Sequence, residues 1–126
     1  MKLDPDCIRD VLLVVESSSS FSKQVGLDDF VHAGLLKKYD FESVMYHIRQ
    51  ANYSGLLENV KFTMGPDVII KDLSPEGHKF LNDIREDTNW NKTKSIAKKV
   101  GSFSLDTLKT VSSDVISSLI NQQFHL

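Results

Sequence analysis

The chain has 126 residues, enough for one domain that buries its own core without disulfide or metal staples. Its hydrophobic content of 40% and charged content of 25% are ordinary for a soluble globular protein. The formal net charge of −2 argues against indiscriminate nucleic-acid binding, although a small local basic patch is still allowed. The single cysteine excludes an intramolecular disulfide and a multi-cysteine zinc site.

The first predicted helix runs from Asp4 to about Ser17, with Pro5 in its first turn. Its apolar side chains follow the 3.6-residue period: Ile8, Val11, Leu12 and Val15. Cys7 lies on the same apolar side, so we expect a buried, inert thiol. The apolar run VLLVV is too short for a signal peptide or a membrane span. We therefore expect a cytoplasmic protein with no membrane segment.

A second, short helix is predicted over Leu27–Leu36, in the stretch LDDFVHAGLL. Phe30, Val31 and Leu35 are its expected apolar contacts. Gly34 weakens the helix near its C-terminal end, because glycine is a poor helix former.

The clearest helix of the front half covers Tyr39–Gly55, with Asp40 as its N-cap and Gly55 as its stop. One side carries four apolar residues at 100° per residue, and we expect it to face the core. These residues are Phe41, Val44, Met45 and Ile48. The opposite side carries Ser43, Tyr46, His47, Gln50 and Tyr53.

The periodicity then changes to that of a β-hairpin. Val60, Phe62 and Met64 alternate with residues that point the other way, and VIIKDL is short and β-branched. Between these two runs stands Gly65–Asp67, which reads GPD and is typical of a turn.

Three helices are predicted after the hairpin. The first begins within LSPEGHKFLNDIRED, where Ser74 can cap it and Pro75 suits its first position. The second contains Trp90 and ends at Gly101. The third is long and carries an apolar stripe at roughly heptad spacing. The stripe consists of Leu105, Leu108, Val115 and Leu119.

The order helix, helix, helix, hairpin, helix is that of a winged helix-turn-helix, in which the third helix is the reader and the hairpin is the wing. We therefore predict an α+β, mostly α fold: a winged helix-turn-helix with two additional C-terminal helices. Residues 1–87 would form the core. Residues 88–126 would form a helical extension that packs on the core or makes a dimer interface.

Four stretches of the chain resemble a family of small bacterial and prophage-encoded proteins of uncharacterised function. They are KLDPDCIRDVLL, VMYHIRQANYSGLL, LSPEGHKFLNDIRED and WNKTKSIAKKVGSFSLDTL, and together they span nearly the whole chain. The span Phe21–Tyr39 matches the family pattern least well. The resemblance implies a winged-helix fold and a mobile-element context, and it implies no activity and no catalytic residue.

The sequence contains no recognisable catalytic or metal motif. It has no Gly-rich phosphate loop, no G-x-S-x-G and no H-E-x-x-H. The four histidines are scattered, and no two have metal-ligand spacing on one helix. They are His32, His47, His78 and His125. The sequence therefore predicts a non-enzymatic protein without a cofactor or a metal.

Our leading interpretation is a regulator of phage or mobile-element origin that binds double-stranded DNA. A reader helix needs short polar or aromatic side chains for base edges and cations for phosphates. The predicted DNA-binding residues are Ser43, Tyr46, His47, Arg49, Gln50, Lys37, Lys38, Lys61 and Lys71. Against this interpretation, Asp40 and Glu42 at the start of the helix would repel phosphate. The basic stretch NKTKSIAKK is either a supplementary phosphate contact or an ordinary exposed helix face.

The alternative is a protein-interaction module, for example a phage-encoded inhibitor or adaptor of a host protein, on a winged-helix scaffold that no longer binds DNA. DNA binding would fall steeply with salt and with Gln50→Ala or Lys61→Ala. A protein interface would depend on Tyr46 and Tyr53 instead. The stripe on the last helix also leaves two alternatives, packing on the first helix of the same chain or a homodimer interface.

Overall fold

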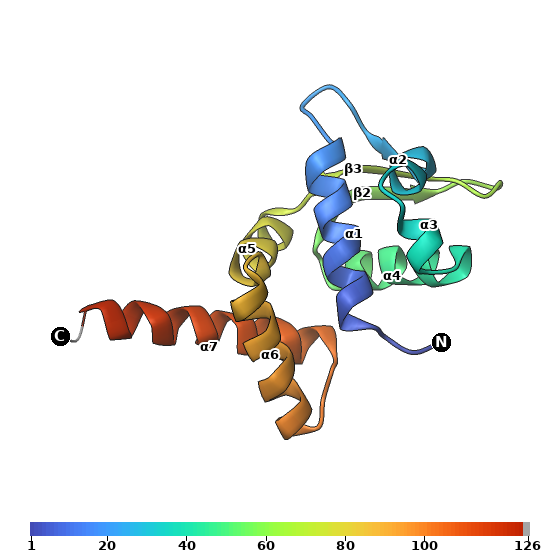
Figure 1. Ribbon diagram of the computed structural model, residues 1–126. Helices are drawn as coiled ribbons and strands as arrows, with labels where there is room; N and C mark the ends of the chain where they lie inside the picture. Colours follow the sequence, from blue (N-terminus) through green and yellow to red (C-terminus); the bar gives the residue numbers. More distant parts are fainter. Residues whose placement is uncertain (125–126) are drawn as a thin grey trace. The chain divides into compact units, whose positions relative to one another are not determined.

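The computed structural model describes residues 1–124 and shows an α+β, mostly helical chain with one three-stranded antiparallel sheet (Figure 1). The chain divides into two compact units, which we call the sheet unit (Met1–His78) and the helical unit (Lys79–Leu126). The division therefore lies nearer the N-terminus than the predicted boundary after residue 87. Within the described part of the chain, no helix has both the length and the apolar character needed to cross a membrane.

The sheet unit contains the predicted helices and hairpin of the front half, together with one strand that was not predicted. Its elements are α1 (Pro5–Ser18), β1 (Val25–Gly26), α2 (Leu27–His32), α3 (Leu35–Lys38), α4 (Phe41–Tyr53), β2 (Leu57–Phe62), β3 (Val68–Leu73) and the start of α5 (Pro75–Ile84). Helix α1 packs against α4 and β3. Cys7 on α1 is fully buried, as predicted, and burial raises the pKa of its thiol to about 12, which keeps it protonated and unreactive.

The sheet has the strand order β1-β3-β2. The predicted hairpin is confirmed: β2 pairs antiparallel with β3, with Val60 opposite Ile70. The Thr63 backbone N–H donates to the Asp67 carbonyl oxygen at 3.2 Å and closes the turn. The unpredicted strand, β1, places Val25 opposite Ile70 on the other edge of β3. A strand of two residues has no periodicity to detect.

The predicted second helix is two short helices, α2 and α3, separated at Gly34. Gly34 adopts φ 82°, a left-handed conformation that glycine reaches at little cost and that ends an α-helix. Phe30 and Leu35 are buried, as predicted, whereas Val31 is 50% exposed and does not belong to the core. The prediction of one continuous helix over Leu27–Leu36 was therefore wrong, because Gly34 breaks the helix rather than only weakening it.

The start of α5 is tied to the turn after α4. The Ser74 hydroxyl donates to the Gly55 carbonyl and accepts from the Gly77 N–H at 3.0 Å, so Ser74 caps α5 as predicted. The Ser74 N–H also donates to the Leu56 carbonyl at 3.0 Å. A Cβ on Gly77 would lie only 2.0 Å from that same carbonyl oxygen. The sequence SPEG therefore needs glycine at 77 because two backbone segments meet there.

The helical unit is built around the contact of α6 (Asp87–Val100) with α7 (Leu105–Phe124). Its buried side chains include Trp90, Thr93 and Ala97 on α6. Leu105, Leu108 and Val115 on α7 are 7%, 0% and 3% exposed within the single chain, and Leu119 is half-buried. This apolar stripe was predicted to pack on the first helix or on a second copy. It lies on α7, the helix that packs on α6. Three of the four residues of the stripe are not available to a second copy.

Candidate functional site

The buried side of α4 is rotated by about 60° around the helix axis from the predicted side, at 100° per residue. Its buried residues are Val44, His47, Ile48 and Ala51. Phe41, which was predicted to face the core, is 36% exposed, and Met45 is only half-buried. The outward face of α4 therefore carries more apolar surface than the sequence pattern predicted.

His47 is the residue that produces this difference, because it is 1% exposed. Its Nδ1 lies 2.7 Å from the Ser43 carbonyl oxygen, and its Nε2 accepts from the Asp4 N–H at 2.8 Å. A carbonyl oxygen can only accept, so Nδ1 carries the proton and the imidazole is neutral. The prediction that His47 contacts DNA was therefore wrong. A polar residue can occupy the core when both ring nitrogens have partners, and one of these partners is 43 residues away.

A groove of about 590 Å³ lies between α4 and the tip of the β2–β3 hairpin, and we call it the α4–hairpin groove. It is lined by Met1, Phe41, Glu42, Met45, Tyr46, Arg49, Phe62, Thr63, Gly65, Pro66 and Asp67. Phe41, Phe62 and Met1 remain 36%, 43% and 72% exposed. Exposed apolar side chains that gather in one concave surface are typical of a binding site rather than of an ordinary protein surface.

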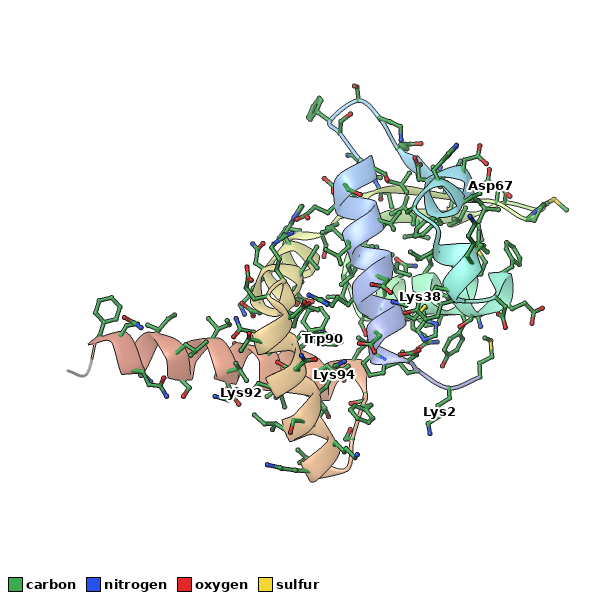
Figure 2. The ribbon with its side chains drawn as sticks, in the orientation of Figure 1. Lys2, Lys38, Asp67, Trp90, Lys92 and Lys94 are labelled. Carbon is green, nitrogen blue, oxygen red and sulfur yellow. The ribbon has the colours of Figure 1, made fainter. Side chains whose placement is uncertain are left out.

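The side chains at the rim of the α4–hairpin groove carry more negative than positive charge. Arg49 is its one cationic side chain, and it lies over the Tyr46 ring with 6.0 Å between the guanidinium carbon and the ring centroid. Glu42 and Asp67 supply two carboxylates. The Asp67 carboxylate accepts from the backbone N–H groups of Leu27 at 3.0 Å and Val68 at 2.7 Å, and these bonds lower its pKa. Asp67 therefore stays ionised at neutral pH and ties the hairpin to α2 (Figure 2).

Two of the four predicted phosphate-binding lysines lie beside carboxylates. The Lys38 ammonium is 2.9 Å from the Asp10 carboxylate, and hydrogen bonding to Asp10 raises the Lys38 pKa (Figure 2). Lys71 on β3 lies 3.5 Å from Glu58 on β2. Lys37 and Lys61 are exposed and form no ion pair within residues 1–124.

Ser43 and Gln50, two more of the predicted base-reading residues, are half-buried and do not line the groove. Tyr46 does line it. Tyr53, the second tyrosine predicted for a protein interface, is 73% exposed and lies outside the lining. Among the described residues, no three histidine, cysteine, aspartate or glutamate side chains are grouped so that they could hold a metal ion.

The two units carry opposite formal charge. The sheet unit contains eight basic and twelve acidic residues, for a net charge of −4. The helical unit contains seven basic and five acidic residues, for a net charge of +2. The whole-chain value of −2 conceals this asymmetry.

Comparison with known proteins places the chain among its relatives. Residues 2–104 match the family described as "Hypothetical protein (DUF2513)". The chain belongs to the DUF2513 family. An uncharacterized protein of Haemophilus influenzae is 33% identical over 123 residues, which cover 95% of this chain and 99% of that protein. No solved structure matches the chain.

The DUF2513 match includes every residue of the α4–hairpin groove except Met1, includes all of α6, and ends before α7. It confirms that the chain belongs to an uncharacterised family, as the resemblance of its four sequence stretches indicated. The mobile-element origin of the protein stays a prediction.

Proposed function

We propose that the sheet unit is a winged-helix module without catalytic activity that binds a segment of a protein partner in the α4–hairpin groove. The order of its elements supports the winged-helix assignment. A three-stranded antiparallel sheet, three helices between β1 and β2, and a hairpin that directly follows α4 match the arrangement of a reader helix and its wing.

The α4–hairpin groove is the observation that carries this proposal. It lies where a winged helix would present its reader and wing to DNA, yet six of its eleven lining residues are apolar or aromatic: Met1, Phe41, Met45, Tyr46, Phe62 and Pro66. DNA binding draws mainly on cations near phosphates. Beside the Met1 amino group, the groove offers one cationic side chain, Arg49, against the carboxylates of Glu42 and Asp67, in a unit of net charge −4. This composition favours a protein partner over DNA.

The partner that fits is an amphipathic segment with one or two large apolar anchors and flanking lysine or arginine residues. The anchors would contact Phe41, Met45 and Phe62, as in other complexes in which a segment lies in an apolar groove. The flanking cations would approach Glu42 and Asp67. A small molecule fits less well, because such sites bury most of the ligand, whereas Met1 and Phe62 at this groove are 72% and 43% exposed.

The leading interpretation from the sequence, DNA binding by α4 and the wing, has less support. His47 is buried, and Lys38 and Lys71 lie beside carboxylates. Lys37 and Lys61 remain exposed, so a test of DNA binding must include substitutions of both.

The proposal is tested by selecting binders for the full chain from a random-sequence displayed peptide library. The groove variant is Tyr46→Ala with Phe62→Ala. The matched control is Tyr53→Ala with Phe21→Ala, which removes the same two ring types from sites that are 73% and 107% exposed and outside the groove. Both variants should keep the wild-type circular dichroism spectrum.

We expect the selected peptides to combine an aromatic or aliphatic anchor with lysine or arginine. Their affinity should fall at least about tenfold for the groove variant, as for interface hot spots, and should stay within about twofold for the control. Selected peptides that bind both variants equally, or a library that yields no binder, would contradict the proposal.

A further inference from the structure

Helix α6 carries a basic surface in the helical unit, far along the chain from the groove. It contains Lys92, Lys94, Lys98 and Lys99, and the sequence has no acidic residue between Asp87 and Asp106. An exposed helix face usually mixes both signs of charge, often as glutamate–lysine pairs four residues apart. A helix face with lysines alone is therefore unusual and favours an anionic ligand.

The lysines form two rows on the exposed side of α6. Trp90, Thr93 and Ala97 define the buried side, and Asn91 and Ser95 are exposed on the opposite side. At 100° per residue, Lys94 and Lys98 fall on one flank of the polar strip formed by Asn91 and Ser95. Lys92 and Lys99 fall on the other flank.

Three of the four lysines are available to a ligand. Lys92, Lys98 and Lys99 are exposed and form no ion pair with any described residue. The Lys94 ammonium lies 5.4 Å from the centroid of the buried Trp90 ring, which fixes its stem against the helix (Figure 2). Lysines in the last turn of a helix are favoured by the helix dipole, which accounts for Lys98 and Lys99. The dipole does not account for Lys92, which lies in the first half of α6.

We propose that α6 binds double-stranded DNA, with its two lysine rows on phosphates and with Asn91 and Ser95 facing base edges. A helix about 10–12 Å across fits the major groove of B-form DNA, which is about 12 Å wide, and its two flanks then face the two phosphate backbones. Asparagine can make a bidentate contact to adenine, and serine can bond to several bases. The inference is independent of the peptide-binding proposal, because it concerns other residues in the other unit.

Two other anionic ligands fit α6 less well. A-form RNA has a deep, narrow major groove that side chains cannot read. A helix that lies on an anionic membrane needs large apolar side chains exposed beside its lysines. The apolar side of α6 is instead buried around Trp90 and Ala97, which leaves Val100 at the C-terminal end as its exposed large apolar residue.

The test measures binding of the full chain to a fluorescent random-sequence DNA duplex by anisotropy at ~50 mM and ~200 mM salt. The α6 variant carries Lys92→Gln, Lys98→Gln and Lys99→Gln. The matched control carries Lys2→Gln, Lys37→Gln and Lys61→Gln, which makes the same charge change in the sheet unit and removes two of the lysines predicted to act with α4. Thermal unfolding of both variants checks that they fold.

We expect salt-sensitive binding that weakens at least about tenfold in the α6 variant, with a salt slope reduced by about 1 for each lysine removed. The control should stay within about threefold of wild type. An equal or larger loss in the control would overturn the proposal in favour of α4 and the wing. No binding at low salt with ~100 μM protein would also overturn it, since ordinary non-specific affinities are about 10⁻⁴–10⁻⁶ M. Binding to phosphatidylserine vesicles without binding to the duplex would overturn it in favour of a membrane.

Discussion

The sheet unit and the helical unit differ in both charge and surface chemistry. The sheet unit has a net charge of −4 and presents an apolar groove whose rim includes two carboxylates. The helical unit has a net charge of +2 and presents a helix with four lysines. A whole-chain charge of −2 argues against nucleic-acid binding only if charge is evenly spread, and here it is not. Charge should therefore be counted for each compact unit.

The two units also differ in the interactions that hold them together. In the sheet unit, residues far apart in sequence meet through strand pairing and through hydrogen bonds such as Asp4 with His47. In the helical unit, neighbouring helices α6 and α7 pack through apolar side chains. Substitutions chosen in each unit therefore show whether the units are stabilised separately.

The largest expected effect is on the helical unit, from Leu108→Ala. Leu108 is fully buried on α7, so the substitution leaves a cavity and lowers the free energy of unfolding by about 3 kcal/mol. Trp90 is the chain's one tryptophan and is buried in this unit, so its fluorescence during urea unfolding reports the change. Ile120→Ala is the control, because Ile120 is 51% exposed, and it should change stability by less than about 0.5 kcal/mol. Equal losses for the two variants would contradict the packing of α7 on α6.

A somewhat smaller effect is expected in the sheet unit, from Gly77→Ala. The added Cβ would lie 2.0 Å from the Leu56 carbonyl oxygen, so the backbone must shift, at a cost of about 2 kcal/mol. Amide hydrogen exchange of β2 and β3 should accelerate accordingly. Gly65→Ala is the control, because an added methyl group there would meet no atom within 4 Å and Gly65 does not have a positive φ. Equal exchange in the two variants would contradict the close approach of α5 to the turn after α4.

His47→Leu should cost the sheet unit about 1–2 kcal/mol, because the Asp4 N–H and the Ser43 carbonyl each lose their bond to the imidazole. Nitrogen-15 chemical shifts of the wild-type imidazole should show a proton on Nδ1 and none on Nε2. His32→Leu is the control, since His32 is exposed and its Nδ1 bonds to the local Asp28 carbonyl. A protonated Nε2 in the wild-type protein would rule out the bond from Asp4.

The elements that were predicted correctly have a local pattern, and the features that were missed depend on distant partners. The Asp40 cap, the β2–β3 hairpin and the Ser74 cap follow from turn and capping chemistry within a few residues, and all three are present. The phase of α4 was wrong because a histidine counts as polar until its partner, Asp4, is known. The periodicity assigned Phe41 and Met45 to the core. Because of this rotation, both residues line the α4–hairpin groove instead.

The candidate site was predictable only in part for the same reason. Tyr46 and Arg49 were singled out on α4, and both line the groove. Phe62 and Asp67 join them from the hairpin. The predicted winged-helix order paired the helix with the hairpin, but nothing in the spacing of these residues indicates which side chains meet. The stripe on α7 showed the opposite error. Its heptad-like spacing correctly indicated helix packing, but spacing cannot distinguish a second copy from a neighbouring helix of the same chain.

The smallest expected effect is the pH dependence of the sheet unit that arises from Asp67. The backbone N–H groups of Leu27 and Val68 lower the pKa of its carboxylate below the ordinary value near 4. A lowered pKa stabilises the folded unit above about pH 4, and this contribution is lost as the pH falls through the folded-state pKa. Asp67→Asn should therefore lower the stability of the sheet unit at pH 7 and reduce the difference between pH 7 and pH 3.

Hydrogen exchange of β3 at the two pH values, corrected for the intrinsic exchange rate, measures this difference. Asp28→Asn is the matched control, because the exposed Asp28 carboxylate accepts no hydrogen bond from any of residues 1–124. Urea unfolding of the helical unit, followed by Trp90 fluorescence, should be the same in both variants if the charge of Asp67 acts only within its own unit. A wild-type pH dependence in Asp67→Asn would show that the two backbone donors do not hold the carboxylate, and the hairpin tip would then not be tied to α2.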